Sequence, residues 1–136
     1  MESYTIVTDI KTFGKIVPGF PTGIGEAFDE LVAVTGNRAG ERDYYGISEY
    51  KNGKMNYYAV AAEKSEGEGQ KLGYEILIIS KGHYLVSELQ DWKKNTHCIK
   101  DIFMEMMQDK SVDKEKPAIE WYKNDHEMFC MLSIKK

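Results

Sequence analysis

The stretch that decides the fold lies at the end of the chain and reads Pro117-Ala118-Ile119-Glu120-Trp121-Tyr122-Lys123-Asn124-Asp125-His126-Glu127-Met128-Phe129-Cys130-Met131-Leu132-Ser133-Ile134. Two runs rich in aromatic and large apolar residues flank Asn124-Asp125. This pair tolerates the positive φ angles of a tight turn, so the stretch predicts a β-hairpin. With these two residues as the turn, Tyr122 faces Glu127 and Glu120 faces Phe129.

Strand side chains alternate between two faces, which sorts the predicted hairpin into two sets. The set predicted to face the core is Ile119, Trp121, Met128, Cys130 and Leu132. The opposite set is Glu120, Tyr122, Phe129 and Met131. Glu120 stands out because burying an unpaired charge is costly. It therefore either sits at a solvated sheet edge or lines a pocket whose ligand or water it meets.

Composition places the chain among globular proteins. Its 136 residues suit one domain, and 42% hydrophobic with 29% charged residues argues against disorder. The formal net charge of -4 speaks against nucleic acid or an anionic membrane as the main partner. The chain has neither a run of 18 apolar residues nor a start typical of a secretory signal. We therefore expect a cytoplasmic protein that does not enter a membrane.

Cysteine and histidine offer little chemistry. Cys98 is predicted on a helix and Cys130 on a strand, so reduced thiols are expected rather than a disulfide. His97 adjoins Cys98, but neighbours on a helix point in different directions, which makes a nucleophile and base pair a weak hypothesis. The histidines show no metal-ligand spacing, and we expect neither a metal nor a cofactor.

The remaining elements follow from periodicity and turn signals. From about Thr22 to Thr35, apolar residues recur at intervals of three and four residues, which predicts an amphipathic helix. A second helix is predicted after a cap at Asn95 or Thr96. Asn52-Gly53 predicts a second hairpin, with strands over Tyr44–Tyr50 and Met55–Ala62. Further strands are predicted in Tyr4–Ile16, Tyr74–Ile79 and Tyr84–Leu89, and a polar linker in Ser65–Lys71.

The two hairpins and the two helices match at a shift of 122 − 50 = 72 positions, which indicates a duplicated strand-helix-strand-strand unit. Residues 1–136 then form one domain, whose halves span about 1–64 and 72–136. Each unit alone is too small to hide its apolar face. The predicted fold is therefore α+β: one antiparallel sheet with two helices on one face and a ligand cleft on the other.

The repeat also predicts the cleft's lining. The side chains predicted to point at the helices are Tyr45, Ile47, Tyr58 and Val60. The side chains predicted to share the open face with Glu120, Tyr122 and Phe129 are Tyr44, Gly46, Ser48, Tyr50, Tyr57 and Ala59. Small residues would leave room there, and aromatic rings would surround it.

Four motifs, taken in order, give the chain a family resemblance. They are Tyr45-Gly46-Ile47-Ser48, Gly82-His83-Tyr84-Leu85-Val86, Trp92 before the second helix, and Lys116-Pro117-Ala118-Ile119-Glu120-Trp121-Tyr122. Together they resemble the GyrI-like small-molecule-binding domain, the effector-binding domain of multidrug-responsive and AraC-type transcription activators. The resemblance implies a pocket between the halves, in which the glutamate matching Glu120 meets cationic, aromatic or otherwise lipophilic compounds.

This resemblance leaves three function classes. The first is a small-molecule-binding protein, with expected ligand contacts at Glu120, Tyr122, Tyr44, Tyr57, Phe129 and Trp92. The second is a hydrolase of strained electrophiles such as cyclopropane-bearing compounds, with Glu120 as general base for a water. The third is a protein-interaction module with a partner such as a topoisomerase. No helix-turn-helix segment is present, so direct DNA binding is not expected, while a protein partner and a homodimer stay open as alternatives.

Overall fold

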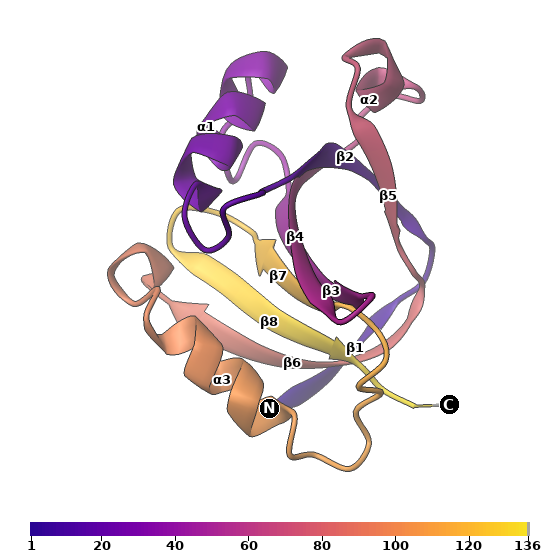
Figure 1. Cartoon of the computed structure of the whole chain (residues 1–136), viewed down its shortest axis with the longest axis vertical. Helices are drawn as coiled ribbons and strands as arrows, with labels where there is room; N and C mark the ends of the chain where they lie inside the picture. Colours follow the sequence, from indigo (N-terminus) through magenta and orange to yellow (C-terminus); the bar gives the residue numbers. More distant parts are fainter. Residues whose placement is uncertain (136) are drawn as a thin grey trace.

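A computed structural model describes residues 1–135 and has one sheet with helices against it (Figure 1). Its strands are β1 (Glu2–Ile6), β2 (Ile10–Ile16), β3 (Tyr44–Lys51), β4 (Lys54–Ala62), β5 (Glu75–Ile79), β6 (Gly82–Gln90), β7 (Ala118–Tyr122) and β8 (Glu127–Ser133). Its helices are α1 (Ile24–Thr35), α2 (Glu68–Lys71) and α3 (Cys98–Met106), with a 3-10 turn η1 (Trp92–Lys94) before α3. The predicted α+β class is confirmed.

The eight strands form a single antiparallel sheet in the order β1-β6-β8-β7-β3-β4-β2-β5. Exchanging each strand for its equivalent in the other half reverses this order, so a pseudo-two-fold axis passes between the central strands β3 and β7. The predicted stretch Tyr4–Ile16 forms two strands, β1 and β2, while β5 and β6 match the two strands predicted over Tyr74–Ile79 and Tyr84–Leu89. Each half thus has one strand beyond the predicted strand-helix-strand-strand unit, and these outer strands are exchanged. β1 pairs with β6 of the second half, and β5 pairs with β2 of the first.

The shift between the halves is not uniform. β2 begins at Ile10 and β6 at Gly82, a shift of 82 − 10 = 72, which agrees with the sequence. β3 begins at Tyr44 and β7 at Ala118, a shift of 118 − 44 = 74. By this second shift Glu120 is the equivalent of Gly46, and the two residues are also partners in the β3–β7 ladder. The pseudo-two-fold axis therefore runs through this residue pair.

The β3–β4 hairpin is confirmed as predicted. Asn52 and Gly53 have φ angles of 54° and 74°, the left-handed pair that a two-residue turn between twisted strands requires. Lys51 and Lys54 close the ladder on either side of the turn. The register of these two strands follows directly from the turn.

The predicted register of the closing hairpin is wrong by one residue. Tyr122 pairs with Met128, not with Glu127, because the connection is longer than two residues. The Asn124 side chain accepts hydrogen bonds from the backbone N–H groups of His126 and Glu127, both at 2.8 Å, and thereby builds an Asx-type turn. A slip of one residue moves every side chain of β8 to the other face.

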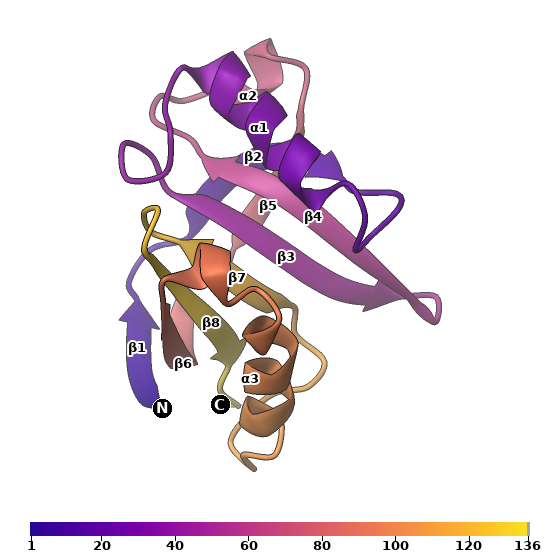
Figure 2. The same cartoon turned by 90° about the vertical axis from the view of Figure 1, so that its left-hand side faces the viewer.

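The two main helices lie against the same face of the sheet, as predicted, one above and one below β3 and β7 in Figure 2. The predicted orientation of the strands toward them is wrong. The residues packed with the helices include Tyr44, Tyr57, Ala59, Tyr122, Met128 and Cys130. The far face carries a second core of Tyr45, Ile47, Tyr58, Val60, Ile119 and Met131, with Trp121 and Phe129 against it. Glu120 alternates with Ile119 and Trp121, so it lies on the helix face.

The segment predicted as a polar linker contains α2, which an ion pair ties to the sheet. Arg42 is 6% exposed and donates to both carboxylate oxygens of Glu68 at 2.8 Å. The same guanidinium reaches the Asn37 side chain and the Ala62 carbonyl. Charge alone gave no sign of this pair, because its members are 26 residues apart.

Two further expectations concern thiols and membranes. Cys98 and Cys130 are both free, as expected from their predicted positions. Among residues 1–135, no helix combines the length and the apolar character needed to cross a bilayer.

Candidate functional site

The candidate site centres on Glu120, which β7 holds in the middle of the sheet. The phenolic hydroxyl of Tyr122, two residues along the same strand, donates to Glu120 Oε1 at 2.6 Å. The hydroxyl of Tyr57, on β4, donates to the same oxygen at 2.7 Å. Tyr57 is 1% exposed and Tyr122 7% exposed, while Glu120 is half-buried. One carboxylate oxygen is therefore fixed by one donor from each half of the chain.

Gly46 makes this arrangement possible. It pairs with Glu120 across the β3–β7 ladder and with Ala59 across β3–β4, so the Tyr57 hydroxyl reaches Glu120 directly above it. A Cβ at position 46 would lie 2.0 Å from the Tyr57 hydroxyl oxygen and 2.5 Å from Glu120 Oε1. Both distances are far below van der Waals contact, so the hydrogen bond between the two halves needs a residue without a side chain here.

Aromatic rings pack on the two tyrosines that hold the carboxylate. Trp92 and Phe28 meet the Tyr122 ring edge-on at centroid distances of 4.8 and 5.2 Å. Phe20, from the loop between β2 and α1, stacks on the Tyr57 ring at 4.8 Å with the planes 5° apart. The Trp92 indole N–H donates to the Asn124 carbonyl at 2.8 Å, which holds its ring against Tyr122. The carboxylate thus lies in weakly polar surroundings.

Glu120 has no basic partner among residues 1–135, because none of the ion pairs there involves it. Within the same residues, the protein's hydrogen bonds to this carboxylate all go to Oε1. Burial raises the pKa of Glu120 above its ordinary value of 4.5, while the hydroxyls of Tyr122 and Tyr57 oppose the shift. The second oxygen, Oε2, is therefore the atom that another group can engage.

The neighbouring ionisable groups respond to the same surroundings. Burial, followed by the negative charge of Glu120, raises the pKa values of Tyr57 and Tyr122 well above 10.0. Burial and Glu120 also raise the pKa of the Cys130 thiol to about 12. Both phenols and the thiol are therefore protonated at neutral pH. The phenols can donate hydrogen bonds, and the Cys130 thiol is a poor nucleophile.

The predicted contact residues separate into three groups. Glu120, Tyr57 and Tyr122 are joined by hydrogen bonds, and Trp92 packs against Tyr122. Tyr44 shares their face, but its hydroxyl bonds the Asn37 carbonyl and Thr35 Oγ1 at the end of α1. Phe129 lies on the opposite face against Trp121, because the longer turn shifts β8 by one residue. It does not share a face with Glu120.

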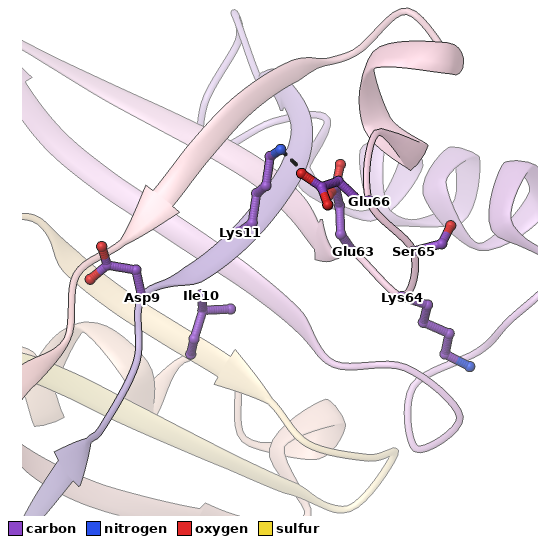
Figure 3. Close-up of a pocket in the computed structure, with 7 residues that line it drawn as sticks. All are labelled: Asp9, Ile10, Lys11, Glu63, Lys64, Ser65 and Glu66. Carbon is purple, nitrogen blue, oxygen red and sulfur yellow. Dashed lines mark ion pairs between the residues drawn. The ribbon is translucent and has the colours of Figure 1, made fainter.

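Two surface hollows occur elsewhere. One, of about 430 Å³, is lined by Asp9, Ile10, Lys11, Glu63, Lys64, Ser65 and Glu66, with Lys11 directed at Glu63 (Figure 3). The other, of about 250 Å³, lies between the β2–α1 loop and α1 and is lined by residues including Pro18, Gly19 and Glu26. Glu120 lines neither of them. Among residues 1–135, no three His, Cys, Asp or Glu side chains are arranged to hold a metal.

Two rings of the site were not identified from the sequence. Phe28 lies on the apolar face of α1, where its spacing indicates only a packing role. Phe20 lies between Pro18 and Pro21 in an irregular loop, where no periodicity shows which way a side chain points.

Comparison with known proteins places the fold but not a family. No family model and no curated protein matches the chain. A Vibrio cholerae integron cassette protein has a TM-score of 0.73 at 10% identity, covering 98% of this chain and 95% of its own. The structure of SAV2435 bound to tetraphenylphosphonium has a TM-score of 0.73 at 13% identity, and the match covers 98% of this chain and 93% of SAV2435. A Staphylococcus aureus MU50 protein proposed to act in transcription regulation has a TM-score of 0.64 at 15% identity, covering 100% and 99%. At these identities the likeness shows the fold alone.

Proposed function

We propose that this chain is a GyrI-like small-molecule-binding protein that takes up lipophilic cations at Glu120. The observation that carries the proposal is a half-buried carboxylate with two hydroxyl donors on one oxygen, and no cationic partner among residues 1–135. A carboxylate without a counter-charge is costly in such surroundings. A bound cation supplies that counter-charge.

The surrounding rings fit the same class of ligand. Cation–π contacts contribute about 0.5 to 2 kcal/mol each, so two or three rings with one carboxylate suffice for micromolar affinity. Tyr57 and Tyr122 contact Glu120 directly, and Phe20 and Trp92 pack on these two rings. The neighbour of similar fold that is bound to tetraphenylphosphonium supports the proposal, since that ligand is a lipophilic aromatic cation.

Titration calorimetry with tetraphenylphosphonium tests the proposal. Glu120→Gln keeps an oxygen acceptor for both tyrosines but removes the charge, and affinity should fall at least about 30-fold, as when one partner of a buried charge pair is lost. Glu105→Gln, an exposed carboxylate on α3, is the matched control and should bind like the wild type. Equal affinity of Glu120→Gln and the wild type would exclude Glu120 as the cation site.

Catalysis is the second candidate, and the raised pKa of Glu120 favours it. A carboxyl group whose pKa lies above 4.5 is a better base near neutral pH, and two phenols within 2.7 Å offer protons. Glu120 would take a proton from a water whose oxygen bonds to one ring atom of a strained electrophile, the ring bond to that atom would break, and a phenol would protonate the ring atom released. The proton on Glu120 would then pass to the phenolate, to which it is directly hydrogen-bonded. Product formation from a cyclopropane-bearing compound, lost in Glu120→Gln, would support hydrolysis. Binding without product would support uptake alone.

A further inference from the structure

Phe20 covers the tyrosine that positions Glu120. Its ring lies parallel to the Tyr57 ring, with centroids 4.8 Å apart and planes 5° apart. Phe20 itself is 39% exposed, whereas Tyr57 is 1% exposed. One face of the Phe20 ring therefore contacts Tyr57 while much of the side chain meets solvent.

The loop that carries Phe20 is attached to the sheet at one end. The Val17 backbone N–H donates to the Tyr57 carbonyl at 2.8 Å, which anchors the start of the loop beside β4. From there the loop is closed by its own turns, Phe20 N–H to the Val17 carbonyl and Thr22 N–H to the Gly19 carbonyl. The hollow of about 250 Å³ lies on the other side of this loop, against α1. The ring of Phe20 can thus leave Tyr57 without breaking any strand pairing.

We propose that Phe20 is a specificity-determining residue that occupies the ring position of the ligand and must leave Tyr57 when an aromatic cation binds. The inference rests on the proposed function and on the stacking of Phe20 on Tyr57. It also names the ligand class more narrowly. The ring that replaces Phe20 lies on Tyr57, whose hydroxyl is 2.7 Å from Glu120 Oε1, so the positive charge must stand on the ring or directly beside it.

The test measures tetraphenylphosphonium affinity by calorimetry for the wild type and Phe20→Ala. Removing the ring removes the stacking contact that the ligand must otherwise displace, so affinity should increase about 2- to 10-fold. Tyr50→Ala, which removes an aromatic ring that is 73% exposed, is the matched control and should leave affinity unchanged. Phe20→Leu keeps the bulk without a flat ring and should fall between the wild type and Phe20→Ala. Thermal melts confirm that each variant is folded.

The outcomes separate this inference from the proposed function. Weaker binding by Phe20→Ala, with binding still dependent on Glu120, would make Phe20 a wall of the site and overturn the inference while the proposed function stands. Unchanged binding would likewise overturn it. Absence of binding by both the wild type and Phe20→Ala would overturn the two together. Binding by Phe20→Ala that is lost again in Phe20→Ala combined with Glu120→Gln would support both.

Discussion

Replacing Gly46 with alanine adds one methyl group at the point where the two halves of the chain meet. The new carbon would lie 2.0 Å from the Tyr57 hydroxyl oxygen, 2.5 Å from Glu120 Oε1 and 2.7 Å from Tyr57 Cζ. Ordinary contact for a Cβ begins at 3.4 Å, so the hydroxyl must retreat by about 3.4 − 2.0 = 1.4 Å. A hydrogen bond of 2.7 Å does not survive such a displacement.

The expected destabilisation has two terms and one offset. Forcing a methyl group into a packed site costs about 1–3 kcal/mol. Losing a hydrogen bond to a charged group costs about 1.5–3 kcal/mol. Exchanging glycine for alanine in a strand returns about 0.5–1 kcal/mol of chain entropy. The free energy of unfolding of Gly46→Ala should therefore fall by about 2–5 kcal/mol.

Urea unfolding measures this change, provided that the free energy of unfolding depends on urea concentration with the same slope in both proteins. Gly25→Ala is the matched control. Gly25 lies in α1 with no atom within 4 Å of an added Cβ, so the same substitution there should stabilise the protein by about 1 kcal/mol. The two alanine variants should thus shift the midpoint in opposite directions. A Gly46→Ala protein as stable as the wild type would contradict the contact between Tyr57 and Glu120 above β3.

Three further predictions concern charges. Because burial raises the pKa of Glu120, its favourable contribution is complete below pH 4.5 and is lost as the pH rises through the folded-state pKa. The stability of Glu120→Gln relative to the wild type should therefore increase as the pH rises above 4.5, as measured by urea unfolding. Tyr57→Phe and Tyr122→Phe each remove a donor that lowers the pKa of Glu120, so each should raise that pKa further in a carboxyl NMR titration and cost about 1.5–3 kcal/mol where the carboxylate is ionised. The bidentate bond from Arg42 lowers the pKa of Glu68 to about 2, so Glu68→Gln should cost about 3 kcal/mol at pH 7, and this difference should shrink as the pH falls from about 4.5 towards 2.

Local signals were enough to predict the helices and the first hairpin. Periodic apolar residues predicted α1 and α3 within a few positions, since one buried stripe determines a helix. Asn52 and Gly53 adopt the positive φ angles that their types favour, so the β3–β4 register was correct. Glu120 was singled out because a charge on a strand rich in aromatic residues needs a partner.

Long-range choices were not visible in the same way. The side chain of Asn124 accepts two backbone N–H groups and lengthens the closing turn, which placed Phe129 on the wrong face in the prediction. The exchange of β1 and β5 between the halves pairs residues as distant as Glu2 and Val86, where alternation gives no information about partners. The prediction of which sheet face turns toward the helices was wrong for a related reason. Hydroxyl donors from two different strands make the helix face acceptable for Glu120, and their positions depend on the assembled sheet.

The pseudo-two-fold axis gives the site a physical origin in the duplication. Gly46 and Glu120 face each other at this axis and are equivalent positions of the two halves. If both positions carried the same residue, two glutamates would place two carboxylates side by side, and two glycines would leave no carboxylate. The chain instead has Glu120 opposite Gly46, and the empty side-chain position lets Tyr57 of the first half reach the acid held by Tyr122 of the second. Neither half alone supplies both donors to Glu120. The proposed cation binding should therefore be absent from a fragment of the second half even if the fragment keeps β7 and β8, whereas adding the first half in trans should restore it. Cation binding by the isolated second half would contradict a site built from both repeats.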